Sequence, residues 1–233
     1  MTAVELLNKW QTLVGGLLAL AGAVITVWAL NRQSHEATQR KARALRAMLP
    51  NQLSSIHGYA IESIRWLKSV REKATLLERG QYGNQSIAVP TCPRPDAAAI
   101  SFLQECVEHF DREPSRFVAI LLSKLQVHQA RVTDLFDYFA NYSLYETKLI
   151  GVPRNIDEFV ASAVDLDANA HQLYPYARFE ADTAPAPPDA NAAMAAFHQC
   201  QLQPVRDTEA WNILTNRYPE TAAKGAYKPQ PTN

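Results

Sequence analysis

Cysteine is scarce in this chain, and its few copies form no recognisable pattern. There are three, Cys92, Cys106 and Cys200, and no two of them form a C-x-x-C pair. An odd number at such wide spacing supplies neither a disulfide framework nor a zinc knuckle. We therefore expect the protein to reside in a reducing compartment.

An excess of charge of either sign is also missing. The 23 Lys and Arg residues balance the 23 Asp and Glu residues, so the formal net charge is zero. A general nucleic-acid binder carries a basic excess that displaces counterions from phosphates. We expect no nucleic-acid partner.

The motifs of common enzyme classes are absent as well. The chain has no H-E-x-x-H, no phosphate-binding loop, no nucleophile elbow and no dinucleotide fingerprint. No segment shows sustained alternation of apolar and polar residues, so strands are not expected. The sequence predicts an all-α, non-enzymatic protein with no cofactor and no metal.

What the chain does have is one long apolar run. From Trp10 to Leu30 it contains no charged side chain. A helix of about 21 residues is about 31 Å long, enough to cross the hydrocarbon core of a bilayer. Trp10 and Trp28 lie near its two ends, where amphipathic rings favour the headgroup level. We predict a transmembrane helix over residues 10–30, with the lipid bilayer as its partner.

The charges on the two sides of this run are unequal. Ahead of it lie only Glu5 and Lys9. Behind it lie five basic residues: Arg32, Arg40, Lys41, Arg43 and Arg46. A Lys/Arg excess within about 15–20 residues of a span marks the cytoplasmic side, where anionic lipids attract such residues. We expect residues 1–9 to form a short extracytoplasmic N-terminus, the rest of the chain to be cytoplasmic, and the two tryptophans and five basic residues to lie at the membrane interface.

Three other interpretations of the apolar run stay open. Ala21-Gly22-Ala23 resembles a signal-peptide cleavage site, but the run continues past it and the preceding residues are not clearly basic. A buried core helix seldom needs about 18 uncharged residues in a row. A helix lying flat on a membrane has a polar face, which this segment lacks. A spanning helix explains the run best.

Small residues recur every four positions within the run, at Gly15, Ala19 and Ala23. This spacing places them on one helix face, where two helices can approach closely. It predicts packing of the membrane helix against a second copy. The alternative explanation is that Gly and Ala are frequent in membrane spans in general.

Pro50 is the first strong helix breaker after the apolar run. We predict a juxtamembrane helix over residues 31–49 that ends there, and a second helix over residues 53–78. Apolar residues recur in the second helix with a seven-residue period that only Ser63 interrupts. They are Leu53, Ile56, Ala60, Leu67, Val70, Ala74 and Leu77. This seam predicts packing against other helices or against a protein partner.

The later segments also predict helices, at residues 97–110, 115–142 and 155–173. Asn155 and Glu158 form a capping pair for the last of these. The middle helix carries an apolar stripe made of Leu121, Leu125, His128, Val132, Leu135, Phe139 and Tyr142.

We predict three regions after the juxtamembrane helix. They are a helical bundle domain over residues 50–180, a linker with weaker helices over residues 181–218, and a disordered tail over residues 219–233. The predicted fold class is all-α, with one N-terminal transmembrane helix continuing into a cytoplasmic antiparallel helical bundle.

The stretch WQTLVGGLLALAGAVITVWALNRQ, followed by RKARALRAMLPNQLSSIHGYA, resembles the start of a recurring group of uncharacterised bacterial proteins. These proteins have a single membrane anchor, a Lys/Arg/Ala-rich helix that ends in Leu-Pro, and a helical cytoplasmic region. The likeness covers residues 10–60. It implies a single-pass topology in the bacterial inner membrane, and no activity comes with it.

Four residues on the predicted 97–110 helix invite a metal interpretation: Glu105, Cys106, Glu108 and His109. Their spacing lets several share one face, but a second helix would have to supply the remaining ligands. The paired Glu-x-x-His motif of di-metal bundles is absent. We interpret the cluster as a solvated acidic face.

Asp165, Asp167 and Asn169 match the opening of a calcium loop. Ala170 stands where that loop needs glycine, and Tyr176 stands where it needs a bidentate Glu. We interpret these residues as a polar face near a helix end.

His128 lies on the apolar stripe of the 115–142 helix. We interpret it as a core histidine with one hydrogen-bonded nitrogen.

The leading functional hypothesis is a non-enzymatic, membrane-anchored interaction or scaffold module at the cytoplasmic face of the inner membrane. One alternative is a membrane-tethered enzyme whose site is assembled from Glu105, His109 and His128. Another is a self-associating membrane assembly or homo-oligomer built through the small-residue face.

Overall fold

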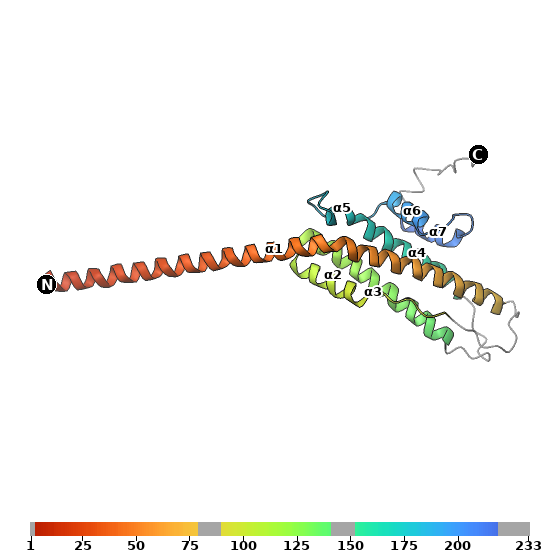
Figure 1. The fold of residues 1–233 in the computed structure, drawn as a ribbon, viewed down its shortest axis with the longest axis horizontal. Coiled ribbons are helices and arrows are strands. Elements are labelled where there is room, and N and C mark those ends of the chain that lie inside the picture. The colour runs from red at the N-terminus through yellow and green to blue at the C-terminus, as the bar shows by residue number, and fades with distance from the viewer. Residues whose placement is uncertain (1–2, 79–89, 141–151, 219–233) are drawn as a thin grey trace. The chain divides into compact units, whose positions relative to one another are not determined.

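The structure, a computed structural model, describes residues 3–78, 90–140 and 152–218. Seven α-helices occupy these ranges, and no residue described there forms a β-strand. They are α1 (Ala3–Glu78), α2 (Ala97–His109), α3 (Arg112–Ala140), α4 (Val152–Gln172), α5 (Tyr174–Ala177), α6 (Ala190–Gln199) and α7 (Thr208–Arg217). The all-α prediction is therefore confirmed (Figure 1).

Two of the shorter helices begin at an aspartate cap. The Asp96 carboxylate accepts a hydrogen bond from the Ala98 backbone N–H at 2.9 Å, at the start of α2. The Asp189 carboxylate accepts one from the Ala192 backbone N–H at 2.8 Å, at the start of α6. Such caps satisfy donors that the first helical turn leaves unpaired. They explain why α2 starts at Ala97, as predicted, and why α6 starts at Ala190.

The chain divides into two compact units between Ala44 and Leu45, and both residues belong to α1. The described part of the first unit is helical, and its large apolar side chains are exposed. An 18-residue window there has a mean hydropathy of 1.8, and none of it is buried. By length and composition, this helix could cross a membrane.

Polar groups within the first unit are satisfied along the helix. Thr26 Oγ1 donates a hydrogen bond to the Gly22 carbonyl at 2.8 Å, as expected for a hydroxyl in an apolar helix. Glu36 pairs with Arg32 at 3.2 Å and with Arg40 at 3.5 Å, each one helical turn away. These charged residues follow the apolar run, whereas Glu5 and Lys9 precede it.

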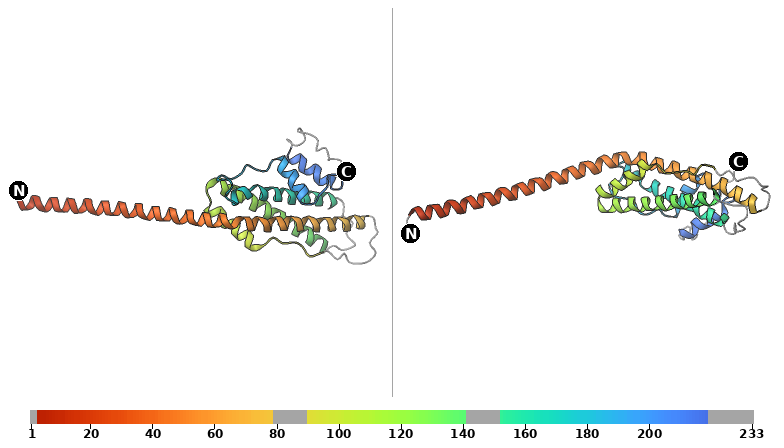
Figure 2. Two further views of the ribbon diagram at one scale, coloured as in Figure 1. Left: turned by 45° about the horizontal axis from the view of Figure 1, so that its top comes forward. Right: turned by 90° about the horizontal axis from the view of Figure 1, so that it is seen from below.

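The second unit, residues 45–233, has one apolar core to which α1, α3, α4, α6 and α7 all contribute. Helix α4 lies between the α6/α7 pair and the helices α1 and α3 (Figures 1 and 2). Every residue from Ala163 to Ala170 is buried as a result. Polar side chains on this stretch must therefore find partners inside the bundle.

The predicted seam of α1 and the predicted stripe of α3 are both buried, and their later members belong to this core. The seam residues from Leu53 to Ala74 are buried, and Ser63 is buried with them. The stripe is buried from Leu121 to Phe139. The last member of each set, Leu77 and Tyr142, lies outside the described side chains.

The predicted helix break at Pro50 is wrong, because α1 continues through it. A proline in a helix interior removes one backbone hydrogen bond and costs about 3 kcal/mol. Leu49 and Leu53, on either side of it, are both fully buried. Burying a leucine side chain stabilises a fold by about 1.5–3 kcal/mol, so these two residues offset the cost of the proline.

One helix prediction and one domain prediction also need correction. Helix α4 begins at Val152, so Asn155 lies in its first turn and is not its cap. The sequence predicts that residues 181–218 lie outside the bundle domain. Three of their side chains, Ala193, Phe197 and Leu214, instead pack in the same core as α4. The predicted tail over residues 219–233 lies outside the described residues.

Candidate functional site

The most polar part of the bundle core is on α4. Its sequence from Asp157 to Asn169 contains three buried aspartates and a buried asparagine. Asp157 pairs with Arg71 of α1 at 2.9 Å. Asp165 pairs with Lys124 of α3, and it also accepts a hydrogen bond from the Asn169 side chain at 3.2 Å. These buried carboxylates tie α4 to its neighbours.

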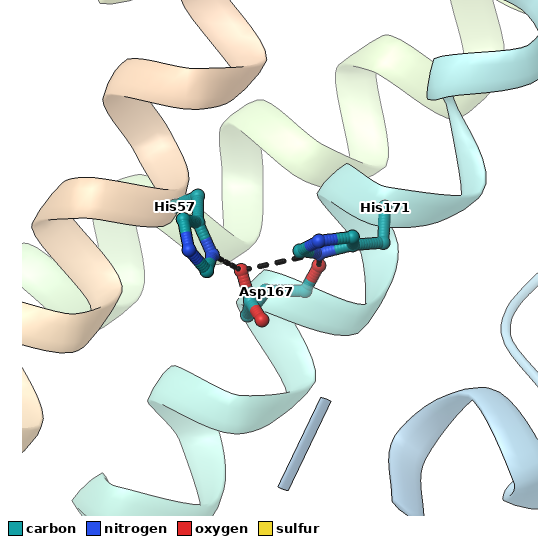
Figure 3. Close-up of side chains that lie close together, drawn as sticks. All are labelled: His57, Asp167 and His171. Atoms are coloured by element: carbon teal, nitrogen blue, oxygen red, sulfur yellow. Dashed lines mark hydrogen bonds and ion pairs between the residues drawn. The ribbon is translucent and has the colours of Figure 1, made fainter. Parts of the chain in front are cut away.

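The third aspartate, Asp167, is the centre of a cluster with two histidines (Figure 3). Its Oδ1 lies 2.7 Å from Nδ1 of His57 on α1 and 3.3 Å from Nδ1 of His171 on α4. The Asp167 side chain is fully buried, whereas those of His57 and His171 are 32% and 33% exposed. The carboxylate thus lies beneath two imidazoles that reach the surface.

The rest of the surroundings hold this cluster in place. The Cys200 thiol, at the end of α6, donates to Asp167 Oδ2 at 3.7 Å. The two imidazole rings meet edge to face, with centroids 5.2 Å apart. His171 Nδ1 also lies 3.0 Å from the Asp167 backbone carbonyl, because the two residues are one turn apart. Each carboxylate oxygen of Asp167 therefore has a defined partner.

Electrostatics within the cluster favour a positive charge. The hydrogen bond to Asp167 raises the pKa of His171 above its ordinary value, against the opposing effect of burial. Burial raises the pKa of the Cys200 thiol, and the neighbouring Asp167 charge raises it further. The thiol therefore stays protonated and acts as a donor, not as a nucleophile.

Within the described residues, His57, Asp167 and His171 are the only group of three or more His, Cys, Asp or Glu side chains whose ligand atoms converge. One atom from each lies within 4.8 Å of the others. Nitrogen, nitrogen and oxygen donors from two helices can hold a divalent metal ion or a shared proton.

Sequence reasoning missed this cluster. Asp167 and His171 have the i, i+4 spacing that places two ligands on one helix face, and this was the available signal. His57 is 110 residues away from Asp167 in the chain, and only the packing of α1 on α4 brings it there.

The structure refines the interpretation of Asp165, Asp167 and Asn169. All three lie near the C-terminal end of α4, as predicted, but they are buried in the bundle. Their backbone is helical, so it cannot wrap around an ion as a calcium loop does.

The predicted cluster on α2 separates into different environments. Cys106 is fully buried in the core, and burial raises its pKa to about 12. Glu105 and His109 are partly exposed, and Glu108 is exposed. The interpretation as a solvated acidic face is therefore wrong for Cys106. In the described part of the chain, these residues do not converge as a group of three ligands.

His128 is fully buried, as predicted, but the predicted hydrogen bond is missing. Neither ring nitrogen has a hydrogen-bond partner among the described residues, and the ring instead meets Tyr59 edge to face with centroids 5.8 Å apart. Burial lowers the pKa of His128 to about 4. A substrate in solvent cannot contact this side chain.

The predicted interface residues fall into two groups. Trp10, Trp28 and the basic residues from Arg32 to Arg43 are exposed in the first unit, where Arg32 lies over the Trp28 ring at 5.6 Å. Arg46 instead belongs to the bundle. Its guanidinium donates to the carbonyls of Tyr176 and Ala181, so the prediction that it lies at a membrane interface is corrected.

Arg46 also holds an unusual backbone position. It lies over the Tyr176 ring at 4.1 Å and over the Phe179 ring at 4.2 Å. Phe179 has a φ of 62°, in the left-handed region that side chains with a Cβ seldom adopt. The stacking on Arg46 helps to hold this strained residue in place.

Gly15, Ala19 and Ala23 are exposed along the apolar part of α1. A Cβ added at Gly15 meets no atom within 4 Å. The single chain leaves this face open, and its packing against a second copy stays a prediction.

The resemblance of residues 10–60 to bacterial single-anchor proteins also stays a prediction. No family model, no curated protein sequence and no solved structure matches this chain.

Proposed function

We propose that this protein is a membrane-anchored helical module whose bundle works at the cytoplasmic face of a bacterial inner membrane. The observation that carries the proposal is the exposure of apolar side chains on α1. Large apolar residues between Val14 and Leu30 are 47–69% exposed, whereas the apolar side chains of the bundle fill a shared core.

The energetics of this surface favour lipid over water. Eight of these residues are Val, Leu or Ile, each of which contributes about −0.3 to −0.6 kcal/mol on insertion at the centre of a membrane helix. No charged residue lies in the run, and Thr26 satisfies its own hydroxyl. No charged side chain in the segment therefore opposes insertion.

The charge distribution supports the proposed orientation. Arg32, Arg40, Lys41 and Arg43 follow the apolar run and are exposed. A Lys/Arg excess on one side of a span favours the cytoplasm. We place the bundle there and the residues before the run outside.

A scaffold or interaction role fits the bundle better than catalysis. His128, one of the three residues first considered for a catalytic site, is sealed in the core. Tethering to a membrane raises the effective concentration of a weakly binding helical surface, so a modest contact becomes functional there.

Carbonate extraction of membranes from cells that make the full chain tests the anchor. We expect the protein in the pellet. Leu20→Arg combined with Val24→Arg moves it to the supernatant, because each arginine costs about 2.5–3.5 kcal/mol at mid-membrane. Ile120→Arg, on an exposed apolar site of α3 in the bundle, is the control and stays in the pellet. Wild-type protein in the supernatant contradicts the proposal.

A deletion of residues 1–31 tests whether the anchor and the bundle are separable. We expect a folded, soluble helical domain that no longer fractionates with membranes. Retention in the membrane fraction, or failure to fold, contradicts this expectation.

Reporter fusions after residue 233 test the orientation. A green fluorescent protein fusion should fluoresce and an alkaline phosphatase fusion should be inactive. The opposite pattern places the bundle outside and refutes the proposed side.

A further inference from the structure

The buried carboxylates of the bundle differ in the charge that compensates them. Three of the four pair with a Lys or Arg side chain. These pairs are Arg71–Asp157, Lys124–Asp165 and Lys68–Asp207. Among the described residues, the ion-pair partners of Asp167 are histidines only, namely His57 and His171.

This difference matters because imidazole, unlike the Lys and Arg side chains, is also a common metal ligand. A buried carboxylate without a compensating charge is costly. A divalent cation held by the same three side chains supplies that charge.

The geometry of the cluster is close to that of a metal site. In a tetrahedral zinc site, with bonds of about 2.0–2.1 Å, neighbouring ligand atoms are about 3.3 Å apart. Asp167 Oδ1 lies 2.7 Å and 3.3 Å from the two histidine nitrogens, and one ligand atom from each residue lies within 4.8 Å of the others. The three side chains point toward one another (Figure 3).

The surroundings provide the support that metal sites have. The Cys200 thiol donates to Asp167 Oδ2 and fixes the orientation of the carboxylate, as outer partners of metal ligands commonly do. Both histidines are about one-third exposed, so a metal ion can enter from solvent and keep a water in its remaining position.

We propose that His57, Asp167 and His171 bind one divalent transition-metal ion of the zinc class, which links α1 to α4. Two imidazoles and one carboxylate favour Zn²⁺, Co²⁺ or Ni²⁺ over Mg²⁺ and Ca²⁺, which prefer all-oxygen sites. The proposal goes beyond the membrane-anchored function and does not depend on it. It also departs from the sequence analysis, which predicts no metal.

Titration of the full chain with Co²⁺ tests the proposal. The tag-free protein is purified in detergent, treated with a chelator and titrated while the visible absorption of the bound ion is recorded. We expect saturation at one equivalent, a spectrum of a four- or five-coordinate ion, and displacement by Zn²⁺. The absence of saturable binding overturns the proposal.

Variants locate the site. His57→Gln and His171→Gln each weaken binding more than about tenfold, because one of only three protein ligands is lost. His35→Gln, on the exposed first unit, and His109→Gln, on α2, retain the wild-type affinity. Wild-type affinity in either cluster variant, or an equal loss in a control, overturns the assignment.

Thermal unfolding provides a readout that does not rely on the spectrum. A saturating metal that binds only the folded state raises the midpoint, by an amount that grows with the ratio of free metal to Kd. We expect Zn²⁺ to raise the midpoint of the wild type and of His35→Gln, and not that of His57→Gln. An equal rise in all three proteins refutes binding at the cluster.

Discussion

Replacing His128 by leucine should stabilise the bundle. In the native protein this side chain is fully buried, and neither ring nitrogen has a hydrogen-bond partner among the described residues. Each unpaired buried polar group costs about 1–3 kcal/mol. Loss of the edge-to-face contact with Tyr59 costs about 0.5–1.5 kcal/mol. We expect His128→Leu to raise the free energy of unfolding by about 1–2 kcal/mol at pH 7.

The stabilisation by His128→Leu should be larger at acidic pH. Burial, with a smaller effect of Arg131, lowers the pKa of His128 from 6.5 to about 4 in the folded chain. The unfolded state therefore binds an additional proton between these two values, and wild-type stability falls as the pH falls through that window. From pH 7 to pH 5 this loss is about 2 kcal/mol. Leucine does not titrate, so the difference in the free energy of unfolding between His128→Leu and the wild type increases by the same amount.

Urea unfolding at pH 7 and pH 5 measures both effects. A Trp10→Phe, Trp28→Phe background leaves the fluorescence of Trp66 and Trp211, which contact the core, as the reporter. His128→Gln is the matched control, because it keeps an unpaired polar group but cannot titrate. At pH 7 the His128→Gln protein should not be more stable than the wild type. Between pH 7 and pH 5 it should not lose the stability that the wild type loses. A His128→Leu protein less stable than wild type at pH 7, or with unchanged pH dependence, refutes the reasoning.

Three further predictions follow from other positions. Pro50→Ala should raise the free energy of unfolding by about 1–3 kcal/mol, because it restores a helix hydrogen bond. The control Pro114→Ala, in the first turn of α3, should change this free energy by less than about 1 kcal/mol. Urea titration measures both variants, and an equal response of the two contradicts the argument. Arg46→Ala should lower the free energy of unfolding by about 2–4 kcal/mol, because two charged hydrogen bonds and the ring stacking are lost. An unchanged urea midpoint contradicts this role of Arg46. Gly15→Leu with Ala19→Leu should abolish oligomers in a membrane-association assay, and unchanged oligomers remove the proposed packing face.

Much of the fold follows from periodicity. The seven-residue repeat of α1 and the stripe of α3 predict their buried faces, because burial of an apolar stripe determines how a helix packs. Pro50 shows where a local rule fails: the proline penalty is real, but the burial of Leu49 and Leu53 exceeds it. Such a balance depends on packing that no local pattern reveals.

The candidate site was less predictable than the fold, for two physical reasons. Asp165, Asp167 and Asn169 look like surface residues, because a sequence does not show that Lys124 and His57 will pair with buried carboxylates. The cluster also joins residues far apart in the chain, and their meeting depends on which faces of α1 and α4 pack together.

The position of α4 between α1, α3 and the two last described helices has a consequence for biosynthesis. The core is incomplete until Leu214 has left the ribosome, about 180 residues after Leu30. At about 5–20 residues per second, the two events are about 10–40 s apart. In the proposed membrane-anchored protein, the apolar segment would therefore reach the targeting machinery before the core of the bundle can close.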